Sequence, residues 1–91
     1  TRFQILAPVV RGKKGTHKKL LSSLASGGFV RVRIDGEVRE LSDSIELDKN
    51  TTHTIEVVID RLMKKDGIQE RLVDSLATCL KLSEGIAVIL F

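Results

Sequence analysis

The sequence predicts an α+β fold: a two-layer sandwich in which two helices cover one face of a mixed or antiparallel sheet of about five strands. Three observations predict it. Apolar residues alternate at period two in several short segments and recur at helical spacing in two others. The segments follow the order strand, helix, strand, strand, strand, helix, strand, without a repeat or linker. The length of 91 residues suits a single core, so we expect one domain over residues 1–91.

An apolar segment at residues 3–10 is the first predicted strand, and it leads into a basic loop at residues 11–15. Thr16 is expected to cap the following helix, because its hydroxyl can accept a hydrogen bond from a free amide of the first turn. The helix is expected to end at Gly27 and Gly28, since glycine tolerates the left-handed conformation of a helix end.

Residues 29–34 alternate in the manner of a half-buried strand. One face is expected to carry Val30, Val32 and Ile34, and the other Phe29, Arg31 and Arg33. The next two residues, Asp35 and Gly36, predict a tight hairpin into a third strand at residues 37–41.

Two registers of this hairpin are compatible with the sequence. A two-residue loop places Val38 opposite Arg33, whereas a three-residue loop pairs Val32 with Val38 and Arg33 with Glu37. We favour the second register, because it keeps apolar side chains together and joins opposite charges.

The second half of the chain is expected to begin with a loop at residues 42–50, containing a short extended piece at 45–47. A long strand at residues 52–62 follows, with a turn at 64–67. The inward residues of that strand are expected to be Ile55, Val57 and Ile59.

The second helix is predicted from a ladder of apolar residues four positions apart. The ladder consists of Ile68, Leu72, Leu76 and Leu80, flanked by Val73, Ala77 and Cys79. Gly85 is expected to end this helix before a terminal strand.

Composition limits the functional classes. The formal net charge of +3 permits an acidic partner or a phosphate backbone. The single cysteine, Cys79, excludes an internal disulfide and favours a reducing compartment, hence a cytoplasmic location; we expect it to be a buried structural thiol. No apolar run approaches the roughly 20 residues that span a bilayer. We therefore expect no membrane contact. We also expect the isolated domain to be a monomer.

No catalytic constellation is recognisable. The histidines His17 and His53 lack neighbours at metal-ligand spacing, and no nucleophile is paired with a base. We expect no catalytic residues, no metal site and no cofactor in this chain. It begins on Thr1 and closes inside an apolar run, which suggests a piece excised from a longer protein.

Six of the nine residues from 11 to 19 are basic. The glycines there have the wrong spacing for a phosphate-binding loop of nucleotide hydrolases. Two interpretations of this segment remain open: a solvated basic loop and a contact with DNA phosphates. The contact would use Arg11, Lys13, Lys14, Lys18 and Lys19.

Three arginines are candidates for binding an acidic partner. Arg31 and Arg33 share one strand face, and Arg61 is expected to emerge where its strand leaves the core. Guanidinium groups bind carboxylates in a fixed fork geometry. The alternative is a set of surface salt bridges to Glu37 or Glu40, and both interpretations remain open.

Four collinear runs resemble the UvrA family, the damage-recognition subunit of bacterial nucleotide excision repair. They are LAPVVRGKKGTH at residues 6–17, GFVRVRIDG at 28–36, LDKN leading into HTIEVVIDR at 47–61, and RLVDSLAT at 71–78. The resemblance spans nearly the whole chain.

The resemblance implies a docking module that binds UvrB and so delivers it to damaged DNA. In the family this stretch is inserted into the first ATP-binding module, and ATP and zinc are bound by other parts of the parent protein. The arginines implicated in UvrB contact correspond to Arg31 and Arg61, with Arg33 and Asp35 as weaker candidates by adjacency. A DNA phosphate contact through the basic loop is the alternative function.

Overall fold

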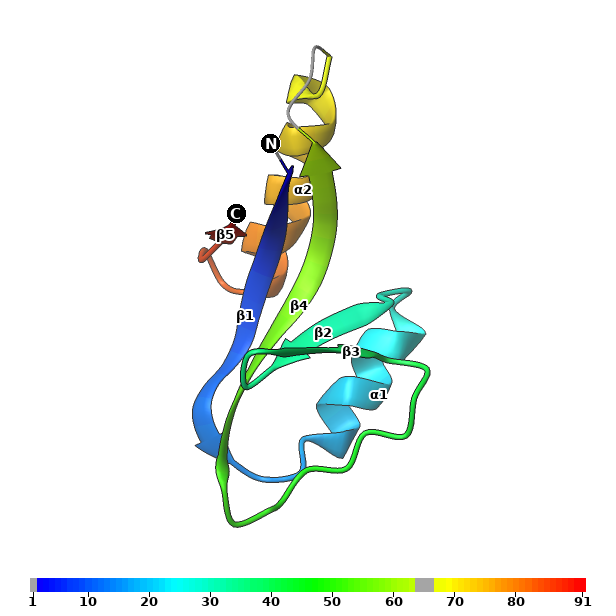
Figure 1. The fold of residues 1–91 in the computed structure, drawn as a ribbon, viewed down its shortest axis with the longest axis vertical. Helices are drawn as coiled ribbons and strands as arrows, with labels where there is room; N and C mark the ends of the chain where they lie inside the picture. The colour runs from blue at the N-terminus through cyan, green and yellow to red at the C-terminus, as the bar shows by residue number, and fades with distance from the viewer. Residues whose placement is uncertain (1, 64–66) are drawn as a thin grey trace.

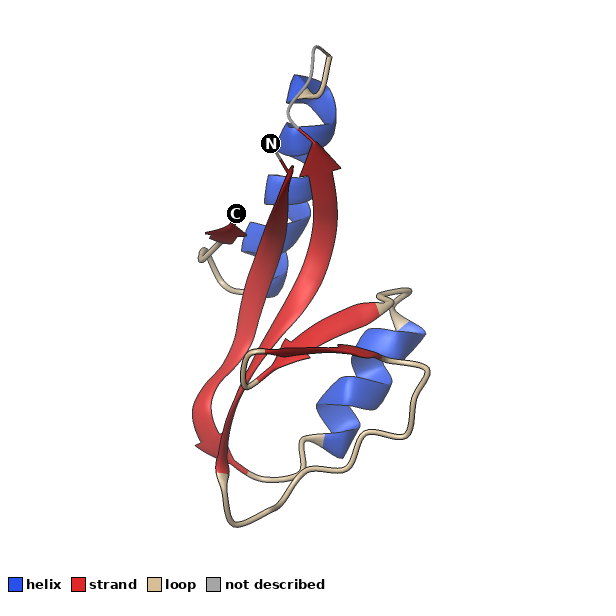
Figure 2. Ribbon diagram, viewed as in Figure 1, coloured by secondary structure: helices blue, strands red, loops and turns tan. Residues whose placement is uncertain are grey.

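The computed structural model describes residues 2–63 and 67–91, and within these it contains two helices and a five-stranded antiparallel sheet (Figures 1 and 2). The elements are β1 (Arg2–Lys14), α1 (Lys18–Ser26), β2 (Arg31–Ile34), β3 (Glu37–Glu40), β4 (Thr52–Met63), α2 (Gln69–Leu82) and β5 (Val88–Leu90). The strand order across the sheet is β3-β2-β4-β1-β5. The predicted α+β class is confirmed, and every neighbouring pair of strands is antiparallel.

The two long strands β1 and β4 form a ribbon along the 45 Å length of the molecule (Figure 1). Helix α2 lies beside the half of the ribbon that contains the start of β1, and α1 lies beside β2 and β3 in the other half. The pairing of β1 with β4 shifts register at three points, one of them just after Pro8. Such bulges bend a strand and increase its twist, so one sheet can serve two helices that lie far apart.

One apolar cluster joins both helices to the sheet. Leu21 and Leu24 of α1 belong to it, as does Cys79 of α2. The strands contribute Ile5, Ala7, Val10, Val32, Ile34, Ile55, Val57 and Leu62. Because both helices pack into the same cluster, they cover one face of the sheet, as predicted.

The favoured register of the β2–β3 hairpin is wrong. Arg33 lies opposite Val38, which is the register of a two-residue loop. The loop residues Asp35 and Gly36 both have positive φ, at 51° and 86°. A turn with two positive φ values matches the right-handed twist of the flanking strands, and this turn geometry outweighs the apolar pairing on which the prediction relied.

The predicted basic loop at residues 11–15 is largely strand. β1 continues to Lys14, which pairs with Thr52 at the beginning of β4. Gly12 has φ 61° within this stretch, and its amide donates a hydrogen bond to the Thr54 hydroxyl at 3.2 Å. The glycine therefore forms an irregularity within the strand and does not end it.

The first helix begins later than predicted. Its N-cap residue is His17, which has φ 53° and makes no side-chain capping bond, so Thr16 is not the cap. The His17 ring lies 3.1 Å from the Lys13 carbonyl oxygen through Nε2. The predicted end at the glycine pair is confirmed, because Gly27 is the C-cap.

The sequence groups Val30 with Val32 and Ile34 on one strand face and places Leu80 on the apolar ladder of α2, but Val30 is 56% exposed and Leu80 is 41% exposed. β2 begins only at Arg31, so the alternation does not extend back to Val30. Residues four apart on a helix drift by about 40° per step. Over the ladder from Ile68 this drift turns Leu80 outward, and Cys79 takes the buried position.

The remaining predictions concern the connections. Residues 41–51 contain no strand, so the extended piece predicted at residues 45–47 is absent. Ile59 lies at a register shift of β4 and is partly buried. Of the turn predicted at 64–67, only Gly67 lies within the described residues, and it has φ 84°.

Candidate functional site

Arg31, Arg33 and Arg61 lie on the sheet face that the helices leave uncovered. Arg31 and Arg33 flank the fully buried Val32, so their side chains project away from the core. Arg61 follows Asp60, whose carboxylate is bonded to α2, so Arg61 projects away from that helix. The predicted exposure of Arg61 is confirmed.

Two of these arginines already have acidic neighbours. The Arg31 Nε atom lies 2.8 Å from Glu40 Oε1, and both side chains are about two-fifths exposed. The Arg33 Nη1 atom lies 3.4 Å from Glu56 Oε1 in a more buried setting. An exposed pair such as the first contributes only about 0–1 kcal/mol, so an acidic partner can compete with Glu40 for Arg31.

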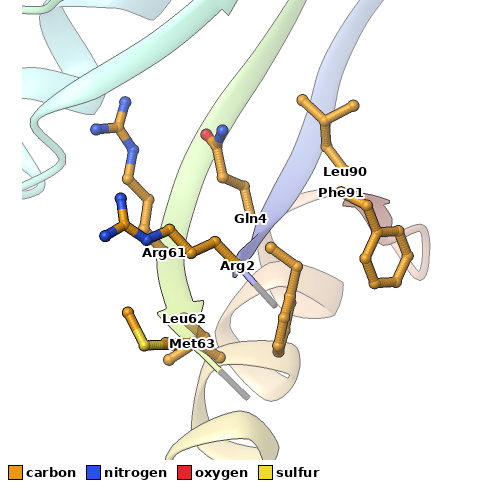
Figure 3. Close-up of a pocket in the computed structure, with 8 residues that line it drawn as sticks. Arg2, Gln4, Arg61, Leu62, Met63, Leu90 and Phe91 are labelled. Atoms are coloured by element: carbon orange, nitrogen blue, oxygen red, sulfur yellow. The ribbon is translucent and has the colours of Figure 1, made fainter.

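Arg61 makes no ion pair with any residue in the described ranges 2–63 and 67–91. Its side chain lies beside those of Arg2 and Gln4 from the neighbouring strand β1 (Figure 3). These residues line a hollow of about 560 Å³ that also includes Met63 and Phe91. The Oε1 atom of Gln4 is buried there without a hydrogen-bond partner in the described part of the chain.

Arg31 and Arg61 line a second hollow, of about 300 Å³, between the start of β2 and residues 58–61 of β4. The structure therefore brings together the two arginines that sequence separates by 30 positions. Arg33 and Asp35 do not line this hollow, and their proposed part in partner binding stays a prediction.

Asp35 is engaged inside the domain. Its Oδ1 atom accepts a hydrogen bond from the Thr54 amide at 2.8 Å, and its Oδ2 atom lies 2.8 Å from His53 Nδ1. The other ring nitrogen of His53 lies 2.9 Å from the Asp48 carbonyl oxygen. Both ring nitrogens thus face groups that can only accept, which favours a doubly protonated imidazolium. This cluster ties the β2–β3 turn to the start of β4.

The hydrogen bond between the two side chains raises the pKa of His53 and lowers that of Asp35. The Asp48 carbonyl raises the His53 pKa further, and the Thr54 amide lowers the Asp35 pKa further. Sequence reasoning missed this cluster, because only the strand register brings the two residues together.

These shifts predict that stability falls as the pH rises above neutrality. A raised pKa in the folded state gives stability that is complete below the ordinary histidine value of about 6.5 and is lost as the pH rises through the raised value. The lowered pKa of Asp35 acts only in acid, below about pH 4. We expect a higher midpoint of thermal unfolding at about pH 5.5 than at about pH 8, and His53→Gln should remove most of the difference.

A second cluster that sequence reasoning missed fixes α2 to β4. Asp60, 15% exposed in its side chain, accepts bonds from Arg71 Nε at 3.0 Å and Arg71 Nη2 at 2.7 Å. The Ser75 hydroxyl donates to it at 2.6 Å, and the Arg61 amide at 2.9 Å. The bond from Arg71 is the main cause of the lowered pKa of Asp60.

The basic residues near the start of the chain are exposed. Arg11, Lys13 and Lys14 lie at the end of β1, and Lys18 and Lys19 in the first turn of α1. None of the five makes an ion pair within the described residues. A DNA contact through them stays a prediction.

The single cysteine has a structural role. Cys79 is fully buried, its Sγ atom lies 3.2 Å from the Leu6 carbonyl oxygen, and burial raises its pKa. The predicted buried thiol is thus confirmed. In residues 2–63 and 67–91 no group of three or more His, Cys, Asp or Glu side chains could hold a metal ion. Neither helix there has the length and apolar character needed to cross a membrane.

Comparison with known proteins gives a consistent set of relatives. The family model described as the UvrA interaction domain matches residues 1–91. The chain is 78% identical over 89 residues to the UvrABC system protein A of Synechocystis sp., and 61% identical over 89 residues to that of Halalkalibacterium halodurans. It is 59% identical over 85 residues to the protein of Bacillus subtilis. These alignments cover 98%, 98% and 93% of the chain but only 9% of each relative.

Proposed function

Because the chain belongs to the family of UvrA interaction domains, we propose that it is a docking module that binds UvrB and so delivers it to damaged DNA in nucleotide excision repair. Its contribution is recognition, and we assign no catalytic step to it. ATP and zinc are bound, on this proposal, by other parts of the parent protein. The module acts as a monomer in the cytoplasm.

The hollow shared by Arg31 and Arg61 carries this proposal. The guanidinium groups of Arg31 and Arg61, which share this hollow, suit the carboxylates of a protein partner. Arg31 holds Glu40 through Nε alone, and Arg61 makes no ion pair within the described residues. A partner carboxylate therefore finds donors that the fold has not used.

Arg33 and Asp35 act in this proposal mainly by holding the hairpin that presents Arg31. Arg33 is paired with Glu56 on β4, and Asp35 fixes the turn through His53 and Thr54. Both residues thus favour a β2–β3 hairpin of fixed geometry beside β4.

The test is binding of purified UvrB to the wild-type chain and to the double variant Arg31→Ala/Arg61→Ala. We expect the double variant to bind at least about 30-fold more weakly, as expected for two lost charge-assisted contacts of 1–2 kcal/mol each. The midpoint of thermal unfolding should hardly change, because both side chains are exposed. Titration calorimetry at two salt concentrations measures the affinity, which should weaken with added salt.

The matched control is Arg11→Ala/Lys13→Ala, which removes the same charge from exposed positions of β1 outside this hollow. It should bind UvrB like the wild type if the contact is local. Equal affinities of the wild type and the Arg31/Arg61 variant would contradict the assignment of the site.

A further inference from the structure

A third arginine lines the hollow between Arg31 and Arg61. Arg71 of α2 is among the residues that line it, so the three arginines of the hollow come from three different elements. Resting on the proposed function, we propose that Arg71 is a further contact residue for the acidic partner and that Asp60 is the residue that positions it.

The hydrogen-bonding capacity of Arg71 is only partly used. A guanidinium group has five N–H donors, and Arg71 directs Nε and Nη2 to Asp60. Its Nη1 atom makes no hydrogen bond within the described residues, and the side chain is 64% exposed. The edge of the guanidinium group opposite Asp60 is therefore open to a carboxylate.

Asp60 determines where that open edge lies. The two parallel bonds fix the plane of the Arg71 guanidinium group, and Asp60 is itself held by the Ser75 hydroxyl and the Arg61 amide. Arg71 is thereby tied to the strand residue next to Arg61. The Arg71 guanidinium group is thus already held in place in the lining of the hollow, which reduces the conformational entropy that this side chain loses on binding.

The balance of charge favours an anionic ligand. Asp60 neutralises one of the three arginines and Glu40 a second, which leaves one net positive charge at the hollow. A carboxylate that enters meets unused donors from all three side chains and restores neutrality.

The rest of the lining indicates a protein segment. Phe29, Val58 and the exposed Val30 form an apolar wall beside the arginines. A segment with an acidic side chain next to an apolar one would bond the arginines and cover this wall. A hydrated phosphate would leave the wall exposed to water.

The experiment uses the full-length protein that carries this domain, with UvrB as the probe. Arg71→Gln is expected to weaken UvrB binding about 10-fold, as for the loss of one charge-assisted contact. The affinity should also depend less steeply on salt than that of the wild type, a change that a merely structural role would not produce. Arg71→Lys keeps the charge but loses the fork, and should bind with intermediate affinity.

Lys81→Gln is the matched control, since it removes one exposed charge from the same helix outside the hollow, and it should bind like the wild type. If Arg71→Gln does not fold, Arg71→Lys carries the test. Wild-type affinity and salt dependence in the Arg71 variants, together with lost binding in the Arg31/Arg61 variant, would overturn this inference and leave the proposed function intact. Failure of the unmutated protein to bind UvrB would overturn both.

Discussion

Replacing Ile55 with alanine is expected to lower the free energy of unfolding by about 3–5 kcal/mol, the range for truncating a buried isoleucine. Ile55 is fully buried on β4, between Val10 of β1 and Ile34 of β2. The large loss follows because three strands pack around this side chain and cannot collapse into the space it leaves. For a small domain this amounts to a large fraction of the total stability.

Chemical denaturation of the 91-residue chain measures this loss as a lower midpoint with an unchanged slope. Val73→Ala is the control, because that side chain is 64% exposed on α2, and it should shift the free energy of unfolding by less than about 0.5 kcal/mol. Similar losses in the two variants would mean that β4 is not the centre of the core.

Asp60→Ala is expected to lower the free energy of unfolding by about 2–3 kcal/mol, since it removes a carboxylate that accepts four hydrogen bonds. The part-buried Ser75 hydroxyl loses its acceptor, whereas the exposed Arg61 amide and the exposed Arg71 side chain can bond to water. Chemical denaturation measures this loss in the free energy of unfolding, as for Ile55→Ala.

Two further variants separate the effect of the lost hydrogen bonds from that of the lost charge. Asp60→Asn keeps the shape and one acceptor oxygen, so it should cost less than the alanine change. Asp74→Ala removes an exposed carboxylate of α2 that forms no ion pair in the described residues, and it should be close to neutral. An Asp60→Ala variant as stable as Asp74→Ala would mean that the cluster does not hold α2 to β4.

Local signals in the sequence predicted the order of the helices and strands, but not all of their bounds and not the register of the hairpin. The Asp35-Gly36 pair identified the hairpin, and the glycine pair identified the end of α1. The register failed because side-chain pairing and turn geometry favoured different loops, and the geometry prevailed.

The candidate site was predictable only in part, because it depends on how separate elements pack against one another. The arginines could be assigned to strand faces from their alternation, but their common hollow depends on how far β2 overlaps β4. The pairing of Asp60 with Arg71 depends on where α2 settles on the ribbon, and that of Asp35 with His53 depends on the turn. Neither has a local sequence signal, because neither pair shares an element.

The long pairing of β1 with β4 also sets the order in which the chain can fold. Its pairs run from Lys14 with Thr52, at the inner end, to Arg2 with Met63, at the outer end. α1 and the β2–β3 hairpin lie wholly inside the loop that the innermost pair closes. Because closing a shorter loop costs less chain entropy, we expect the hairpin to form early and the ribbon to zip from Lys14 toward Arg2. The strand positions of Gln4 and Arg61 would then be among the last to become native.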